Sequence, residues 1–548
     1  MRTGLNVPLT PLRFLERSAN VHPDMLACVD GPRRISFARF RTDATRFAQA
    51  LRANGLAPGD RVGVLATNSY EALLSQFAVP LAGGVLVAIN SRLAPAEVDF
   101  IVRHADIHFL LGDDHLLAGV RPTLDSSGVV TQYIVGAESD GLEPDVSGQE
   151  NTRTFSDFLT DGSDEPLPFT VADENDPISI NYTSGTTGQP KGVVYSHRGA
   201  YLNALGAIST QNFSRDTVYL WTLPMFHCNG WCTGWAVMAA TGTQVCLRAV
   251  RGDEMWQLIE DEGVNAMCGA PAVLTTMVES EAKRRVTNLS AVVAGAPPSP
   301  TIITRCENIG VEVTHVYGLT EPYGPFTVCE PKPDWHDMTI RRRAVLKARQ
   351  GVAMLTNEDV RIVQLTDDDD DSLVDVPADG KTMGEIVLTG NGVMQGYYRN
   401  PEATEVAFRG GWFHTGDLGV MHPDGYIQLL DRAKDIVVSG GENISTVEVE
   451  QTVVSYPDVS DCAVIGVPDD KWGERVRAYV VLRTEVQGDV DPALLTEAII
   501  AHCRTHIAGY KVPRDIVVVD DLPRTSTGKV KKNVLRDEAW SSKTAKIQ

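Results

Sequence analysis

The chain has 548 residues, more than one hydrophobic core normally supports, so two or more domains are expected. Its apolar content of 43% and charged content of 22% are ordinary for a soluble globular protein. The formal net charge of −22 argues against nucleic acid as a partner, because a phosphate backbone is bound by a surplus of Lys and Arg. A polyanionic ligand must therefore be met by a local cluster of donors.

No segment predicts a signal peptide or a membrane span. The N-terminal residues lack an apolar run, and the longest apolar stretch, about Phe77 to Ile89, is interrupted by Pro80 and two glycines. The nine cysteines are scattered singly, and the close pair Cys228 and Cys232 lacks the companion ligands of a zinc site. We therefore expect a cytoplasmic protein with reduced, buried thiols.

The first 170 residues alternate helical and strand-like patterns. An amphipathic helix is expected from Phe37 to Leu51, with Ser36 as its N-cap. Arg61–Leu65 and Val85–Ala88 have the pattern of buried strands, and a helix is expected between them at Tyr70–Ala82. This βαβ order predicts a parallel sheet covered by helices.

The alternation resumes after residue 192, where Ser196 is the expected N-cap of a helix that reaches Leu205. Further elements are expected at Thr243–Leu247 (strand), Asp253–Glu262 (helix) and Ala291–Ala294 (strand). The acidic run Asp367–Asp371 is interpreted as a solvated loop rather than a metal site. Beyond a boundary near Asp431–Asp435, strand and helix patterns form a compact α+β set of small-domain length.

The most informative stretch is Tyr182-Thr-Ser-Gly-Thr-Thr-Gly-Gln-Pro-Lys-Gly192. Its glycines allow backbone N–H groups to turn toward an anion, and its hydroxyl side chains add uncharged donors. Lys191 supplies a point charge for phosphate oxygens. The spacing does not fit the Walker pattern. Alone, the stretch fits a polar surface loop as well as it fits a phosphate site.

A second stretch is Leu223-Pro-Met-Phe-His-Cys-Asn-Gly-Trp231. Phe226, His227, Trp231 and the later Trp235 are candidates to line an apolar slot with one titratable group, which suits a carboxylic acid with an apolar tail. The alternative is that these aromatic side chains belong to the core.

Two segments offer groups for a nucleotide. Ala294-Gly-Ala-Pro297 is followed by Thr314-His-Val-Tyr-Gly-Leu-Thr-Glu321. Tyr317 presents a flat face for a base, Thr320 a hydroxyl for phosphate, and Glu321 an oxygen ligand for Mg²⁺. A strand that ends in an ordinary turn is the alternative interpretation.

Two later segments complete the set. In Gly411-Trp-Phe-His-Thr-Gly-Asp-Leu-Gly419, Asp417 is expected in a tight turn, where its carboxylate can accept from two ribose hydroxyls. Pro523-Arg-Thr-Ser-Thr-Gly-Lys529 is a basic loop near the C-terminus. Aspartate in a glycine turn is also common for backbone reasons, and a lone cationic loop is usually only solvated.

In this order and spacing, the five segments resemble the adenylate-forming superfamily of acyl-CoA synthetases, firefly luciferase and nonribosomal-peptide adenylation domains. The similarity covers about residues 10 to 540. Within the superfamily, the chain looks most like the short- to medium-chain acyl-CoA ligases that include 3-methylmercaptopropionate-CoA ligase. The segments that suggest this are 223–231, 347–351 and 439–445.

The resemblance implies a two-step reaction. A carboxylate attacks the α-phosphate of ATP, giving an acyl-adenylate and pyrophosphate, and the thiol of coenzyme A then displaces AMP. Catalysis of the first step is largely positioning and electrostatic stabilisation. The implied small molecules are ATP, Mg²⁺, coenzyme A and a small carboxylic acid.

The resemblance also assigns roles to residues of this chain. The phosphates would be bound by Thr183, Ser184, Gly185, Thr186, Thr187, Gly188 and Lys191. Adenine, ribose and α-phosphate would be bound by Gly295, Ala296, Pro297, His315, Tyr317, Gly318, Thr320, Asp417 and Arg432. The catalytic residues would be Lys529, His227, Glu321 and Thr186, with Glu321 also holding Mg²⁺ and Lys529 also contacting ATP. The thiol tunnel would include Gly440, Gly441 and Glu442, and Lys434 would be the hinge.

We therefore expect an α/β fold with a large N-terminal domain of parallel-type sheets, covering helices and a β-barrel-like part. This domain would span residues 1–431, followed by a hinge at 432–434 and a small, mobile α+β domain at 435–548. The family rotates its C-terminal domain between the two steps, so that the catalytic lysine leaves and the thiol enters.

Three interpretations of the function are compatible with the sequence. The first is an ATP-dependent acid–CoA ligase. The second is an adenylate-forming enzyme with another acceptor, such as a carrier protein or, in diazotases, an aryl amine that receives activated nitrite. The third is a non-catalytic nucleotide sensor, against which the presence of Lys191, Glu321, Asp417 and Lys529 counts. A homodimer is expected from what is usual in the family. Pro322 departs from the small polar residue expected after Glu321.

Overall fold

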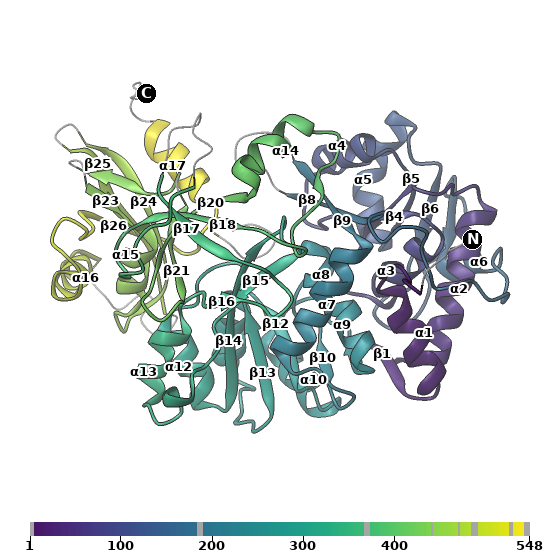
Figure 1. The fold of residues 1–548 in the computed structure, drawn as a ribbon, viewed down its shortest axis with the longest axis horizontal. Helices are drawn as coiled ribbons and strands as arrows, with labels where there is room; N and C mark the ends of the chain where they lie inside the picture. The colour runs from purple at the N-terminus through teal and green to yellow at the C-terminus, as the bar shows by residue number, and fades with distance from the viewer. Residues whose placement is uncertain are drawn as a thin grey trace.

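The computed structural model describes residues 5–183, 190–365, 373–432, 434–439, 442–469, 472–483, 492–524 and 530–541. In Figure 1 the N-terminal sheet lies at the right, a second large sheet at the lower centre, and the small C-terminal part at the left. The acidic run Asp367–Asp371 lies outside the described residues.

The first sheet is parallel over six neighbouring strands, with two antiparallel strands at one edge. In spatial order its strands are β19 (Gly396–Tyr397), β9 (Lys191–Ser196), β8 (Pro177–Thr183), β4 (Val85–Ala88), β3 (Arg61–Leu65), β5 (Ile107–Gly112), β6 (Gln132–Val135) and β7 (Thr152–Thr154). The βαβ prediction for this region is confirmed.

The second sheet also has a parallel centre, because its strands from β14 to β1 run in one direction. In spatial order the strands are β16 (Val352–Ala353), β15 (Gly324–Val328), β14 (Val311–Leu319), β13 (Leu289–Val293), β12 (Ala266–Gly269), β10 (Val218–Leu220), β11 (Thr243–Val245), β1 (Leu26–Asp30) and β2 (Arg33–Ser36).

Helices cover both sheets. They are α1 (Leu12–Val21), α2 (Phe37–Ala53), α3 (Tyr70–Leu81), α4 (Pro95–Ala105), α5 (Asp114–Ser127), α6 (Phe155–Leu159), α7 (His197–Gln211), α8 (Cys228–Trp231), α9 (Thr233–Ala240), α10 (Gly252–Asp261), α11 (Pro271–Glu279), α12 (Pro300–Asn308), α13 (Ile340–Lys347) and α14 (Pro401–Ala407). The predicted N-caps are confirmed, since Ser36 accepts from the Arg39 N–H and Ser196 from the Gly199 N–H.

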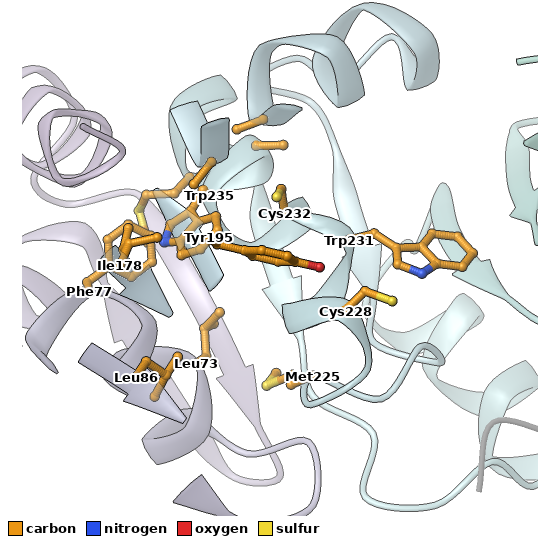
Figure 2. Packing of buried hydrophobic residues seen from close by; sticks show 14 of the residues in the cluster. Leu73, Phe77, Leu86, Ile178, Tyr195, Met225, Cys228, Trp231, Cys232 and Trp235 are labelled. Atoms are coloured by element: carbon orange, nitrogen blue, oxygen red, sulfur yellow. The ribbon is translucent and has the colours of Figure 1, made fainter. Parts of the chain in front are cut away.

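The main core lies where the two large sheets meet. Every residue of α3 is buried, because this helix contacts β1 of the second sheet as well as β3 and β4 of the first. Figure 2 shows Leu73 and Phe77 of α3 beside Ile178 of β8 and Trp235 of α9. A helix that is packed from all sides has no solvent-exposed polar face, which explains its largely apolar sequence.

A third sheet follows, in the region expected to be barrel-like. It is antiparallel and consists of β17 (Val360–Val363), β18 (Gly384–Leu388), β20 (Phe413–Met421) and β21 (Ile427–Arg432). Beyond it, the C-terminal part contains β22 (Val437–Ser439), β23 (Glu442–Ile444), α15 (Thr446–Val454), β24 (Val459–Asp469), β25 (Gly473–Leu482), α16 (Pro492–His506), β26 (Asp515–Val518) and α17 (Lys532–Ser541).

The predicted fold class is confirmed, because a large α/β part precedes a smaller α+β part with its own buried clusters. All cysteines are buried, as the sequence predicted, and none forms a disulfide bond. Among the described residues, no helix is both long and apolar enough to traverse a lipid bilayer.

A buried charge network joins the two large sheets. The Arg248 guanidinium, which follows β11, donates to Asp30 of β1 at 2.9 Å and lies 3.5 Å from Asp113, which follows β5. Arg33 in turn contacts Asp30 and Glu71, and both of these carboxylates are about 2% exposed. Buried charges of this kind are tolerated only when each has a partner.

We predict that Arg248→Met lowers the free energy of unfolding by about 3 kcal/mol, because it leaves the Asp113 carboxylate buried without a cation. The matched control is Arg284→Met, which removes an exposed partner of Glu260 and should cost less than about 1 kcal/mol. Denaturant unfolding followed by circular dichroism measures both values. Equal losses in the two variants would contradict the inter-sheet role of Arg248.

Candidate active site

The glycine-rich stretch connects β8 to β9 as a hairpin. Thr183 and Lys191 are paired across the two strands, with the Thr183 hydroxyl 3.5 Å from the Lys191 carbonyl oxygen. The predicted phosphate-binding residues Ser184, Gly185, Thr186, Thr187 and Gly188 lie outside the described residues. The described flanks place the exposed Lys191 at the end of the hairpin, next to the edge strand β19.

Lys191 and Glu321 meet at Tyr397. The Lys191 ammonium lies 4.8 Å from the centre of the Tyr397 ring, and the Tyr397 hydroxyl donates to Glu321 Oε1 at 2.9 Å. Burial raises the pKa of the Glu321 carboxyl above its ordinary value, and the hydrogen bond from Tyr397 opposes this rise. The structure therefore brings together a cation and a carboxylate that are far apart in the sequence.

The segment after β14 also contacts the second predicted stretch. The Tyr195 hydroxyl donates to the Thr320 carbonyl oxygen at 2.6 Å, and the Thr320 hydroxyl lies 3.5 Å from Cys228 Sγ. His227 precedes Cys228, and its ring nitrogens are 3.8 and 3.9 Å from the Cys228 sulfur. Burial lowers the pKa of His227 to about 4, so its imidazole is neutral near pH 7.

Asp417 is the centre of a second cluster. It is 3% exposed and accepts a hydrogen bond from the Tyr317 hydroxyl at 2.8 Å through Oδ2. Its other oxygen, Oδ1, lies 3.2 Å from Arg432 Nε, yet accepts no hydrogen bond of good geometry among the described residues. One oxygen of the buried Asp417 carboxylate thus has no hydrogen-bond donor among the described residues.

The prediction of a tight turn at Asp417 is wrong, because Asp417 lies inside β20 and pairs with Arg432 of β21. Gly416 has φ +68°, and the pairing shifts register between Leu418 and Gly419. Glycine and the irregular register bend the strand without ending it.

The residues expected around adenine follow β13 and form part of β14. Gly295 is exposed with φ +85°, and Ala296 and Pro297 are half-buried beside it. A Cβ at Gly318 would lie 1.8 Å from the Gly324 carbonyl oxygen, so only glycine fits there. His315 is 2% exposed, its Nδ1 lies 3.0 Å from the Ala348 carbonyl oxygen, and burial lowers its pKa to about 4. The His315 ring is therefore buried against the C-terminal end of α13.

The residues expected to line one acid slot lie in different surroundings. Phe226 lines a cavity with Asn229 and α3, whereas Trp231 lines a different one. Trp235 is fully buried, and its indole N–H donates to the Gln76 carbonyl oxygen at 3.2 Å. Figure 2 shows Trp231 and Trp235 pointing in opposite directions. For Trp235, the structure favours the core interpretation.

The cavity beside Trp231 runs along one face of α7. It is lined by Asn203, Ala207, Thr210, Gln211, Trp231, Val292, Val316, Tyr323, Pro325 and Met354. Val292 of β13 and Val316 of β14 form part of its wall, so the cavity lies against the second large sheet. Its position at the carboxyl ends of parallel strands is typical of ligand sites in α/β proteins.

Two family models match the chain. The model described as AMP-binding enzyme matches residues 15–398, and the model described as AMP-binding enzyme C-terminal domain matches residues 448–529. The chain belongs to the AMP-binding enzyme family. The resemblance inferred from the sequence motifs is confirmed.

Curated relatives match this AMP-binding enzyme over nearly its whole length. An acetate–CoA ligase from Humulus lupulus is 40% identical over 544 residues, covering 97% of this chain and 94% of the relative. A 4-hydroxybutyrate–CoA ligase from Metallosphaera sedula is 39% identical over 535 residues, with the same coverage of 97% and 94%. The ATP-bound structure of MatB from Rhodopseudomonas palustris is 28% identical, with a TM-score of 0.81 over 96% of this chain and 98% of that chain.

A left-handed turn in this AMP-binding enzyme was not foreseen from the sequence. Residues Cys228 to Cys232 all have positive φ, from 43° at Asn229 to 60° at Gly230. A left-handed conformation costs about 1–2 kcal/mol per non-glycine residue, and such strain is concentrated at functional sites. The turn directs Trp231 toward β15, where a Cβ at Gly324 would lie 2.8 Å from the indole.

Hydrogen bonds hold the segment between the large and small parts of the AMP-binding enzyme. Asp431 Oδ2 accepts from the Thr446 backbone N–H at 2.6 Å and from its hydroxyl at 2.5 Å. Arg536 of α17 donates to Asp435 at 2.8 Å. The predicted hinge residue Lys434 is exposed between these two contacts.

The predicted tunnel residue Glu442 is exposed at the start of β23. Gly440, Gly441 and the predicted catalytic residue Lys529 lie outside the described residues.

Sequence reasoning missed Tyr397, Tyr195 and Cys228 as neighbours of the predicted groups. Tyr195 lies three residues after the glycine-rich stretch, but its contact with Thr320 spans 125 residues. For Tyr397 the available signal was its place in Gly396-Tyr-Tyr-Arg-Asn-Pro401, an aromatic pair ahead of a helix start. Nothing in that segment indicates by itself which distant carboxylate it contacts.

We predict that Asn229→Gly leaves the free energy of unfolding nearly unchanged, because glycine adopts the left-handed conformation freely. Asn229→Val should lower it by about 2 kcal/mol relative to Asn229→Gly, because a β-branched residue is strained at positive φ. Urea unfolding of the two variants measures the difference. If the Asn229→Val variant is as stable as the Asn229→Gly variant, the assignment of a left-handed turn is wrong.

Proposed function

We propose that this protein is an ATP-dependent carboxylic acid–CoA ligase that acts through an acyl-adenylate and releases AMP and pyrophosphate. The observation that carries the proposal is the meeting of Lys191, Glu321 and Asp417 around the end of β14, in a chain whose relatives include named CoA ligases. The overall charge of the protein is negative, so these local groups must provide the attraction for a nucleotide.

The nucleotide would lie between the two clusters. Asp417 Oδ1 is a buried acceptor that suits a ribose hydroxyl, and Tyr317 together with Gly295, Ala296 and Pro297 would enclose adenine. Arg432 is held beside Asp417 by their ion pair. Thr320 would contact the α-phosphate, while Lys191, Thr183 and the hairpin loop would bind the β- and γ-phosphates.

The donor set near Glu321 fits Mg²⁺. A single carboxylate is sufficient, because Mg²⁺ is usually held by one or two carboxylates together with substrate phosphates and water. Within the described ranges, no group of three or more His, Cys, Asp or Glu side chains could hold a metal ion, so a dedicated protein cage is not offered there. When bound at Glu321, the ion would neutralise charge on the phosphates.

The remaining roles follow from the family pattern. Lys529 would bridge the carboxylate and the α-phosphate during adenylation. His227 would act as a neutral group at the acid, since its pKa is lowered to about 4 by burial. The acid's tail would lie beside Trp231 and α7, where the small cavity has both apolar and polar walls and would have to widen to admit it. Thr186 would add a hydroxyl at the phosphates.

We also propose that residues 1–431 and 435–548 are separate domains joined by a hinge at 432–434. The contacts Asp431–Thr446 and Asp435–Arg536 flank this short segment and support a pivot between them. Rotation there would withdraw Lys529 and bring Gly440, Gly441 and Glu442 to the thiol. Binding of Mg²⁺, a homodimeric state and a cytoplasmic location remain predictions.

The function is tested by measuring pyrophosphate release with short, branched, thioether and aromatic acids, and with nitrite. We expect release that depends on one class of carboxylic acid, followed by AMP release that depends on coenzyme A. Full turnover without coenzyme A, but with an amine or a carrier protein, would instead identify the enzyme as one with another acceptor.

Lys529→Ala should reduce adenylate formation by at least about 100-fold, because the charge that offsets the developing negative charge is lost. Thioester formation from supplied acyl-adenylate should be largely spared. Rapid-quench assays of the two half-reactions measure both rates. Equal losses in both would contradict the two-conformation account.

Lys434→Pro should have the opposite effect on the two half-reactions, because proline fixes φ at the proposed pivot. We expect adenylate formation to persist and thioester formation to fall by at least about tenfold. An unchanged rate of thioester formation would place the hinge elsewhere.

A further inference from the structure

Tyr397 has no role in the function proposed so far, although it lies between two of the groups on which that function depends. Its ring faces the Lys191 ammonium at 4.8 Å, and its hydroxyl donates to Glu321 Oε1 at 2.9 Å. The ring therefore separates a cation from a carboxylate. No direct ion pair between Lys191 and Glu321 occurs in this part of the described structure.

The backbone of Tyr397 is held on two sides. In β19 it pairs with Val193 of β9, and its N–H donates to the Thr404 hydroxyl of α14 at 2.9 Å. Because β9 begins at Lys191, the ring and the ammonium belong to one pair of strands at the edge of the first sheet.

Glu321 belongs to the second sheet, since it follows β14. The Met394 N–H, three residues before Tyr397, donates to the Glu321 carbonyl oxygen at 2.7 Å. The segment 394–397 thus holds both the backbone and the side chain of Glu321 against the edge of the first sheet.

We propose that Tyr397 is a positioning residue that keeps the Lys191 ammonium and the Glu321 carboxylate apart, so that both remain available to the nucleotide and its metal ion. An unpaired ammonium and carboxylate at close range attract each other, and a direct ion pair would neutralise both groups. The aromatic ring offers the ammonium a weaker contact that a phosphate oxygen can replace. The hydroxyl fixes one oxygen of Glu321. This inference rests on the proposed function, because it assigns Lys191 to phosphate and Glu321 to Mg²⁺.

Two substitutions test the ring and the hydroxyl of Tyr397 separately. Tyr397→Phe keeps the ring and removes the hydrogen bond to a charged group, so affinity for MgATP should fall by about tenfold. Affinity for ATP with the metal chelated should change little, because Lys191 keeps its contact. Tyr397→Ala removes the ring, so Lys191 and Glu321 should pair directly and affinity should fall for both forms of ATP.

The neighbouring tyrosine provides a matched control. Tyr398 is the next residue of the chain, and its ring lies 5.7 Å from that of His104 rather than against Glu321. Tyr398→Phe should leave the affinity for MgATP unchanged.

Equilibrium binding is measured by isothermal titration calorimetry on the full chain without acid or thiol, and thermal unfolding is recorded for each variant. The expected result is a loss of MgATP affinity in Tyr397→Phe at unchanged unfolding temperature, with a rise in KM for MgATP but not for the acid. If Tyr397→Phe binds MgATP as the native protein does, or if Tyr398→Phe shows the same loss, the positioning role is wrong. If the native protein binds no MgATP, the proposed function fails instead.

Discussion

The hydrogen bond from the Tyr317 hydroxyl to Asp417 joins the second large sheet to the antiparallel sheet that leads into the small C-terminal part. Asp417 is buried, so its charge has to be met by both Tyr317 and Arg432. Arg432 is also the last residue of β21, directly before the proposed hinge. One carboxylate thus joins the cluster proposed to bind the ribose to the segment proposed as the hinge.

A hydrogen bond from a tyrosine to a carboxylate also links two sheets at the other end of the candidate site. Tyr397 connects the edge of the first sheet to Glu321, as Tyr317 connects the second sheet to the third. In both places a tyrosine hydroxyl donates to a carboxylate in a partly dry environment, where such bonds are strong. The candidate site is therefore assembled from side chains that link neighbouring sheets, and the Arg248 network links the two large sheets.

Much of this could be predicted from the sequence. The helix at Tyr70–Leu81, the strand at Arg61–Leu65 and the caps at Ser36 and Ser196 follow from local pattern alone. The family was recognisable because short motifs around Lys191, Glu321 and Asp417 occur in a fixed order. Prediction from local sequence pattern failed where tertiary contacts determine the conformation. Trp235 enters the core because α9 packs against α3, Asp417 lies in a strand that bends without ending, and the left-handed turn at 228–232 has no signature in residue type except Asn229 and Gly230.

The central claim is that the acid is activated by direct attack of its carboxylate on the α-phosphate of ATP. Transfer of ¹⁸O from the labelled carboxylate of an accepted acid tests it most directly, with the label located by mass spectrometry after one turnover with coenzyme A. The account predicts one ¹⁸O in AMP and none in pyrophosphate. Unlabelled AMP, or label in inorganic phosphate or pyrophosphate, would contradict it.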